Sequence, residues 1–123
     1  LQGNLIPVWP EADNRLHCCL GSLPVPSQLS LKSWPEDASL LVDPAAIALE
    51  PEPEAEACVM GREFQGHAWQ LRVQAADQQL RVTQPLEHDY NRGTRCRLGF
   101  RKGATAMLFP QRISLNATDP YGS

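Results

Sequence analysis

The sequence predicts an all-β fold, built as a small antiparallel barrel or sandwich of short strands. Eleven prolines and eight glycines interrupt the 123 residues frequently, which favours short strands over long helices. The clearest apolar–polar alternation, over residues 68–74, has the period of two that a half-buried strand requires. Turns that contain Gly, Asn or Asp separate the strand-like stretches, as they do in small antiparallel barrels and sandwiches.

The first 50 residues contain several short apolar stretches that end near proline or glycine. The strands predicted from them are 5–9, 15–20, 23–25 and 39–42. After the last of these, Asp43 and Pro44 are predicted to start one helical turn, because Asp is a preferred N-cap and Pro suits the first helical position. Residues 1–50 are therefore expected to form the N-terminal part of the β-domain.

An acidic connector of alternating proline and glutamate follows at residues 51–56, directly after Glu50. Its composition is typical of a solvated segment without regular structure. We interpret it as a loop between two halves of one domain. The alternative is a docking segment for a basic partner.

The second half of the chain, residues 57–110, has the strongest strand pattern. Trp69, Leu71 and Val73 fall on one face of their strand, and polar residues fall on the other. The further strands predicted here are 57–64, 79–83, 94–101 and 104–109. The tail, residues 111–123, has no clear period, so we expect it to be loose.

Length and charge limit the classes of protein to which the chain can belong. A chain of 123 residues is long enough for one hydrophobic core, and two independent cores would be undersized. The net charge of −3 gives no overall basic excess of the kind that drives nucleic-acid binding. No run of about eighteen apolar residues occurs, so no membrane insertion is predicted. The chain begins without Met, which suggests a piece of a longer protein.

The spacing of the cysteines disfavours a zinc site. The four cysteines are Cys18, Cys19, Cys58 and Cys96, and they form no CxxC pair. We expect small buried thiols in a reducing cytoplasm, with Cys96 on the apolar face of its strand. A disulfide framework is the alternative, because the number of cysteines is even.

No motif for catalysis or cofactor binding is present in the sequence. It lacks the GxxxxGK[ST] phosphate loop, the GxSxG nucleophile elbow, the HExxH zinc motif and the EF-hand loop. The three histidines lie far apart, and no serine has a base nearby in sequence. We therefore predict no enzyme activity and no catalytic, cofactor-binding or metal-binding residues for this chain. A metal site that includes His88 and Asp89 is the alternative.

Arginines crowd the second half of the chain. They are Arg72, Arg81, Arg92, Arg95, Arg97, Arg101 and Arg112. Alternation places all but Arg92 and Arg112 on outward positions of strands. The favoured interpretation is a solvated or protein-contacting face, balanced by the acidic connector. A module for single-stranded nucleic acid is the alternative, but it needs exposed aromatic residues, and Trp69 and Phe100 are predicted to face inward.

Four blocks of the sequence resemble a known regulatory domain. Residues 57–73 with 80–82, and residues 93–100 with 106–110, are similar to the TOBE segment of ATP-binding subunits of ABC importers. Gly3-Asn4 and residues 20–25 are similar to the opening of the same domain. The resemblance covers about residues 1–110 and is nearest to the ferric-iron importer type.

This resemblance implies a C-terminal, OB-like regulatory domain that follows a nucleotide-binding domain in the parent chain. In such importers the ATPase motifs belong to the preceding domain. The implied partners are a second copy in a homodimer, the nucleotide-binding domain and, indirectly, the permease subunits. The implied location is cytoplasmic, peripheral on the inner face of the cell membrane. Family members also receive inhibitory signals, and some branches bind an oxyanion.

Two departures from the family pattern bear on ligand binding. Asp43-Pro44-Ala45 stands where the family often has Arg-Pro-Glu before an apolar residue, which puts in doubt any contact or ligand that those charged groups serve in relatives. The Ser-Ala-Arg-Asn pattern of molybdate-binding relatives is also absent from the sequence. The second departure disfavours the oxyanion-binding alternative.

We single out Phe64, Gly66 and His67 as a candidate interaction region, because they form a corner between two predicted strands. The alternative is a plain strand-end turn. In that case Phe64 lies in the core, and Gly66 is needed only for its backbone freedom.

Overall fold

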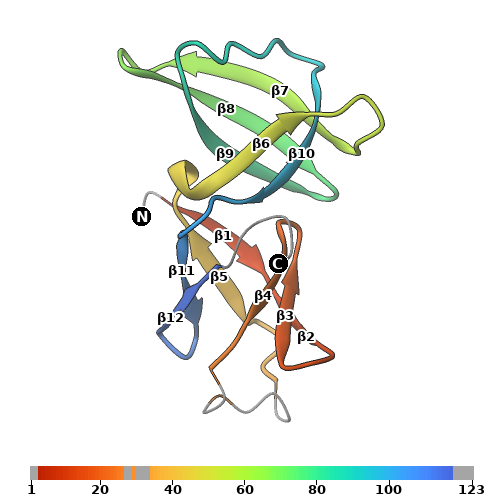
Figure 1. Cartoon of the computed structure of the whole chain (residues 1–123), viewed down its shortest axis with the longest axis vertical. Coiled ribbons are helices and arrows are strands. Elements are labelled where there is room, and N and C mark those ends of the chain that lie inside the picture. The colour runs from red at the N-terminus through yellow and green to blue at the C-terminus, as the bar shows by residue number, and fades with distance from the viewer. Residues whose placement is uncertain (1–2, 27–28, 30–33, 118–123) are drawn as a thin grey trace.

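The computed structural model describes residues 3–26, 29 and 34–117. Within these ranges the chain forms twelve strands and one short 3₁₀ turn, arranged in three antiparallel sheets (Figure 1). The predicted all-β fold with antiparallel sheets is therefore confirmed. In the same ranges, no helix has the length and apolar character needed to cross a membrane.

Two small sheets form the lower lobe of the molecule in Figure 1. The four-stranded sheet has the order β1 (Asn4–Pro7), β5 (Ser39–Val42), β11 (Thr105–Phe109) and β12 (Ile113–Asn116). The three-stranded sheet consists of β2 (Trp9–Glu11), β3 (Arg15–Cys18) and β4 (Gly21–Pro24). Alternate side chains point inward, and the largest buried ones are Ile6, Leu16, Leu23, Leu40, Leu108 and Leu115.

One five-stranded sheet forms the upper lobe. Its order is β6 (Ile47–Pro51), β10 (Arg95–Phe100), β7 (Ala57–Phe64), β8 (Ala68–Ala75) and β9 (Gln78–Pro85). The sheet curls until its edge strands β6 and β9 come into contact, but the described residues form no ladder that closes a barrel (Figure 1). Its buried side chains include Ile47, Val59, Leu71, Val73, Leu80, Val82 and Phe100.

The chain crosses between the lobes twice, at neighbouring points. The first crossing is the 3₁₀ turn η1 (Pro44–Ala46), where the Asp43 carboxylate accepts a hydrogen bond from the amide of Ala45 at 2.8 Å. The helical turn predicted from Asp43 and Pro44 is thus confirmed as a 3₁₀ turn. The second crossing follows β10, and there the Arg101 amide donates to the Ala46 carbonyl at 2.9 Å. The upper lobe is therefore one continuous segment between two parts of the lower lobe.

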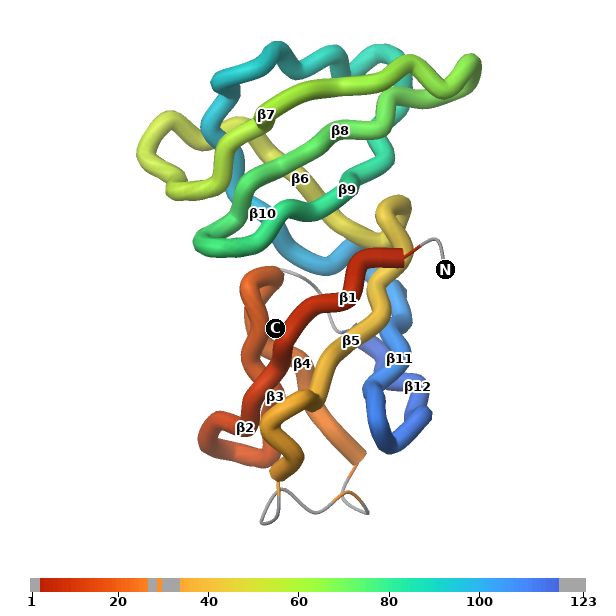
Figure 2. The backbone as a smooth tube through the Cα atoms, turned by 180° about the vertical axis from the view of Figure 1, so that it is seen from behind, coloured from red at the N-terminus to blue at the C-terminus, as the bar shows by residue number. Residues whose placement is uncertain are grey.

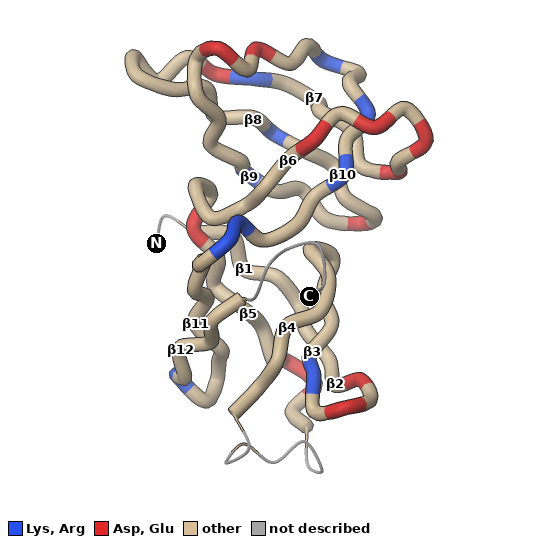
Figure 3. Tube along the Cα trace, in the orientation of Figure 1, with Lys and Arg blue, Asp and Glu red and all other residues tan. Residues whose placement is uncertain are grey.

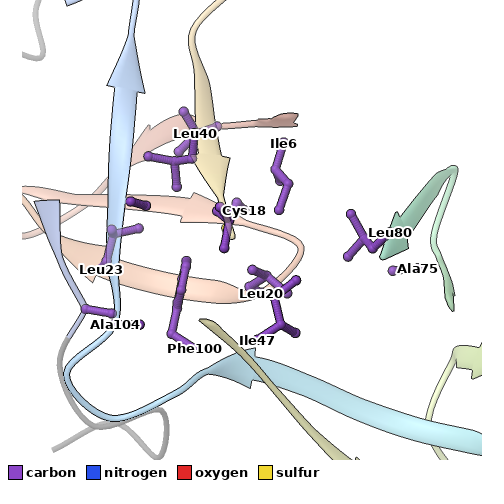
Figure 4. Packing of buried hydrophobic residues seen from close by; sticks show 14 of the residues in the cluster. Ile6, Cys18, Leu20, Leu23, Leu40, Ile47, Ala75, Leu80, Phe100 and Ala104 are labelled. Atoms are coloured by element: carbon purple, nitrogen blue, oxygen red, sulfur yellow. The ribbon is translucent and has the colours of Figure 1, made fainter. Parts of the chain in front are cut away.

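A single hydrophobic cluster extends through both lobes. Figure 4 shows Cys18 and Leu20 of the lower lobe beside Ile47, Leu80 and Phe100 of the upper lobe, with their side chains in one interior. The single core that the chain length predicted is therefore present.

The acidic connector lies within the upper lobe rather than between two halves of the domain. It joins β6 to β7, and both of these strands pair with β10 in the same sheet. The structure places the change of lobe at η1, where the Asp43-Pro44 turn ends β5. The predicted division into 1–50 and 57–110 therefore does not coincide with the lobes.

The prediction of a loose tail from residue 111 is wrong for its first part. Residues Ile113–Asn116 form β12, which pairs with β11 in the lower lobe. Leu115 lies opposite Ala106 and is only 2% exposed, so this short strand closes part of the core. Four residues are too few for a visible alternation in the sequence. The rest of the predicted tail, 118–123, lies outside the described residues.

Candidate functional site

The predicted interaction residues occupy the turn between β7 and β8. Figure 1 shows this turn projecting from the end of the upper lobe. Phe64 ends β7, and the Gln65 amide donates to the Ala68 carbonyl at 2.8 Å to close the hairpin. Gly66 has a φ of +90°, a left-handed conformation that glycine adopts without steric cost. His67 is exposed beside it.

Phe64 lies on the surface rather than in the core. Its side chain is 60% exposed, and its ring meets the edge of the Trp69 ring at 5.6 Å between centroids. The indole N–H of Trp69 donates to the Leu86 carbonyl at 3.3 Å, and Leu86 is itself 40% exposed. We call Phe64, Trp69 and Leu86 the apolar corner. Large apolar side chains gathered on a surface are typical of a contact site for another protein.

Charged side chains border the apolar corner. The guanidinium of Arg62 lies over the Trp69 ring, 4.8 Å from its centroid, and also pairs with the carboxylate of Asp89. Arg62 is thereby held against the aromatic face. Aromatic and arginine side chains that are fixed in this way are the residues that most often dominate protein–protein binding energy.

A β-bulge explains how Arg62 and Phe64 reach this site. In the pairing of β7 with β8, Val59 lies opposite Val73, but Gly61 lies opposite Arg72, so Met60 is an extra residue. The extra residue reverses the alternation in the rest of β7. Arg62 and Phe64 therefore lie on the same face of the sheet as Trp69.

His88 and Asp89 do not come together as a metal site. Asp89 pairs with Arg62, whereas His88 Nδ1 lies 3.3 Å from Oε1 of the buried Gln84 side chain. The ring of His88 packs near Tyr90 instead, at 5.9 Å between centroids. Across the described part of the chain, no group of three or more His, Cys, Asp and Glu side chains is placed to hold a metal ion.

The cysteines are free thiols in the structure. Cys96 is fully buried, as its place in the alternation predicted. Burial raises the pKa of Cys18 from 9.0 to about 12, and burial also raises the pKa of Cys96 to about 11. Both thiols therefore stay protonated at neutral pH and are poor nucleophiles.

The arginines divide into two groups. All five that alternation placed outward are exposed, which confirms that prediction: Arg72, Arg81, Arg95, Arg97 and Arg101. Arg97 pairs with Glu50 at 2.6 Å, just before the acidic connector, and Arg95 donates to the backbone carbonyl of Glu56 at 3.3 Å. Arg72 and Arg81 form the second group and lie opposite each other on β8 and β9, away from the connector.

The sequence missed Arg62, Trp69, Leu86 and Asp89 as parts of the site. Alternation alone predicted that Trp69 faces inward, and its ring is in fact only partly buried at the open end of the curled sheet. The signal that was available is the Gly61 position in an otherwise regular strand, because an isolated glycine in a strand often marks a bulge.

Comparison with protein families identifies the domain. The family model described as the TOBE domain matches residues 35–108, which include β5 to β10 and most of β11. No curated protein matches the chain. Because the match covers more than half of the sequence and the whole five-stranded sheet, the chain belongs to the TOBE domain family.

Proposed function

We propose that this chain is the C-terminal regulatory and dimerisation domain of the ATP-binding subunit of an ABC importer of the ferric-iron type. Membership of the TOBE family supports the regulatory part, because TOBE domains are small, non-catalytic domains with regulatory or ligand-binding roles, typical of ABC transporter subunits. The ferric-iron assignment rests on the resemblance of residues 57–73 and 93–100 to that type of subunit.

The dimerisation part of the proposal rests on the apolar corner. Phe64 is 60% exposed although it is a large apolar side chain, and Trp69 and Arg62 are fixed around it. Burial of such a corner against a second copy removes apolar surface from water and places aromatic and arginine side chains at the centre of the contact. A two-fold pair is the commonest form of such self-association.

Pairing gives the domain a way to regulate its parent subunit. A partner that binds one arrangement of the paired domains more tightly shifts the population toward that arrangement. The attached nucleotide-binding domains then close more or less readily. In this proposal the domain contacts the nucleotide-binding domain directly and the permease only indirectly, and the subunit is peripheral on the cytoplasmic face of the membrane.

Two variants test the contact surface. Sedimentation velocity of the Phe64→Ser chain should show a dimer dissociation constant raised by about tenfold or more, as expected for a central aromatic residue. Trp9→Ser is the control, because Trp9 is another exposed large apolar side chain, at 50%, but lies on β2 in the lower lobe and outside both proposed contact surfaces. Equal dimer affinities of the two variants would contradict the assignment of the corner.

Two further measurements test the parent protein and the absence of catalysis. The coding sequence upstream of residue 1 should contain the Walker and signature motifs of an ABC ATPase. Calorimetry with Mg-ATP should show no binding to this chain, and clear binding would overturn the non-catalytic assignment.

A thermal-shift screen with molybdate, tungstate, sulfate and ferric salts tests the alternative, a domain that senses a small ligand. A saturable rise in melting temperature with one oxyanion would replace the proposal with a ligand sensor.

A further inference from the structure

A groove with arginine side chains runs over β8 and β9 of the upper lobe and reaches β1 of the lower lobe. Two hollows of about 460 Å³ and about 580 Å³ share Arg72 and Arg81 in their linings. The other basic or amide residues that line the groove are Asn4, Arg62, Gln70, Gln78 and Gln79. We call this surface the arginine groove.

Arg72 and Arg81 are an unusual pair for the surface of a sheet. They lie directly opposite each other, on β8 and β9, and like charges at such positions destabilise a sheet. Neither guanidinium forms an ion pair with the described residues. The single acidic residue that lines the groove is Glu63, whose carboxylate accepts a hydrogen bond from the side-chain Nε2 of Gln65. The groove therefore keeps excess positive charge.

Gly61 leaves space for the side chain of Arg72. A methyl group at Gly61 would overlap the Arg72 guanidinium, so the arginine lies flat across β7 only because this residue has no side chain. A guanidinium can bind a carboxylate through two parallel hydrogen bonds. The side-chain amides of Gln70 and Gln79 supply further donors along the groove.

The acidic connector is the complementary surface on the same chain. Figure 3 shows acidic residues gathered in the loop between β6 and β7, apart from the basic positions on β8 and β9. Backbone hydrogen bonds order this loop, from Glu52 to the Arg95 carbonyl at 2.9 Å and from Ala55 to the Glu52 carbonyl at 3.0 Å. Within the described residues, the exposed side chains of Glu54 and Glu56 form no ion pair.

Within one copy, the acidic connector and the arginine groove lie on opposite sides of β7, so they do not bind each other. The connector hydrogen-bonds to β10, which lies on one side of β7, whereas the groove lies over β8 and β9 on the other side. We infer that the acidic connector of a second copy docks into the arginine groove, so that Arg72 and Arg81 bind the carboxylates of Glu54 and Glu56. This inference rests on the dimerisation proposed above. In a two-fold dimer the contact forms twice, once in each direction.

The groove favours an acidic protein segment over nucleic acid. Its lining contains no aromatic side chain on which a base could stack, and the chain as a whole has a net charge of −3. Arg72 and Arg81 lie on the opposite face of the sheet from Trp69, so the arginine groove and the apolar corner are separate parts of the surface.

A charge-swap experiment tests the contact. The groove variant is Arg72→Glu with Arg81→Glu, and the connector variant is Glu54→Arg with Glu56→Arg. The control is Arg92→Glu with Arg112→Glu, which makes the same change in charge at exposed positions outside the groove. Circular dichroism and thermal melting establish that each variant is folded. Sedimentation velocity then gives the dimer dissociation constants of the separate variants and of their mixture.

The inference predicts that each swapped variant alone dimerises at least about tenfold more weakly than the unaltered chain, because both contacts become repulsive. The control should dimerise like the unaltered chain. A mixture of the groove and connector variants should recover a dimer, because both contacts are attractive again in the mixed pair. Added salt should weaken the dimer of the unaltered chain, which gives a test that needs no variant.

The outcomes separate this inference from the proposed function. A dimer that both swaps leave unchanged would overturn the inference and leave dimerisation standing. An unaltered chain that stays monomeric would overturn both. Salt-sensitive binding of a single-stranded oligonucleotide that the groove variant loses, with no effect of the swaps on the dimer, would assign the groove to nucleic acid instead.

Discussion

The side chain of Asn4 forms two hydrogen bonds with the backbone of Arg81. Its Nδ2 donates to the Arg81 carbonyl at 2.8 Å, and its Oδ1 accepts from the Arg81 amide at 2.8 Å. Figure 2 shows β1 and β9, the edge strands that carry these residues, on the same side of the molecule. The amide group of Asn4 thus substitutes for one residue of a neighbouring strand and joins the two lobes.

Loss of the Asn4 side chain should destabilise the fold. Asn4→Ala leaves the amide and carbonyl of Arg81 unpaired at a site where Asn4 itself is 7% exposed. Each unsatisfied group costs about 1–3 kcal/mol when water does not reach it. We therefore expect the free energy of unfolding, measured with denaturant, to fall by at least about 2 kcal/mol. Asn91→Ala, at an exposed position, is the control and should change it by less than about 0.5 kcal/mol. Equal effects of the two substitutions would contradict the joining role of Asn4.

Replacement of Gly61 should change binding more than stability. Gly61→Ala forces the Arg72 guanidinium out of its place over β7, but only the flexible end of a side chain must move. We expect a stability change of less than about 1 kcal/mol, together with a weaker dimer in sedimentation velocity. A dimer of unchanged affinity would show that the position of Arg72 over β7 does not contribute to pairing.

The apolar corner and the core should respond differently to truncation. Phe64 is exposed and touches mainly the edge of Trp69, so Phe64→Ala should cost no more than about 1.5 kcal/mol in unfolding free energy. Leu71 is completely buried on β8, so Leu71→Ala should cost about 2–5 kcal/mol. If the two losses are equal, Phe64 is a core residue and the corner is not a surface site.

Alkaline pH should weaken the fold through Cys18. Its pKa is 9.0 in the unfolded chain and about 12 in the folded protein, so the stabilisation by the protonated buried thiol is complete below pH 9 and is lost as the pH rises toward 12. Between neutral pH and pH 10, the free energy of unfolding of the unaltered chain should fall by about 1 kcal/mol more than that of Cys18→Ala. Urea unfolding of both proteins at the two pH values measures this difference, and parallel losses would contradict it.

Local patterns in the sequence predicted the parts of the structure that depend on neighbours along the chain. Alternation placed Leu71 and Val73 inside and the arginines outside, and Asp43 with Pro44 marked the turn that became η1. These features follow from side-chain direction in a strand and from capping.

The features that the sequence did not reveal depend on distant residues. Asn4 and Arg81 are 77 positions apart, and nothing near either residue signals their contact. The bulge at Met60 reverses the alternation of β7, which places Arg62 and Phe64 beside Trp69. Such tertiary pairings decide which side chains form a site, whereas local periodicity decides only which face each side chain occupies.

Sedimentation equilibrium of the unaltered chain, at low and at high salt, tests most directly whether this domain binds a second copy of itself. Self-association of the exposed apolar corner and the charged groove predicts a reversible monomer–dimer equilibrium that shifts toward monomer as salt is added. A chain that remains monomeric at every concentration and salt level would contradict the account.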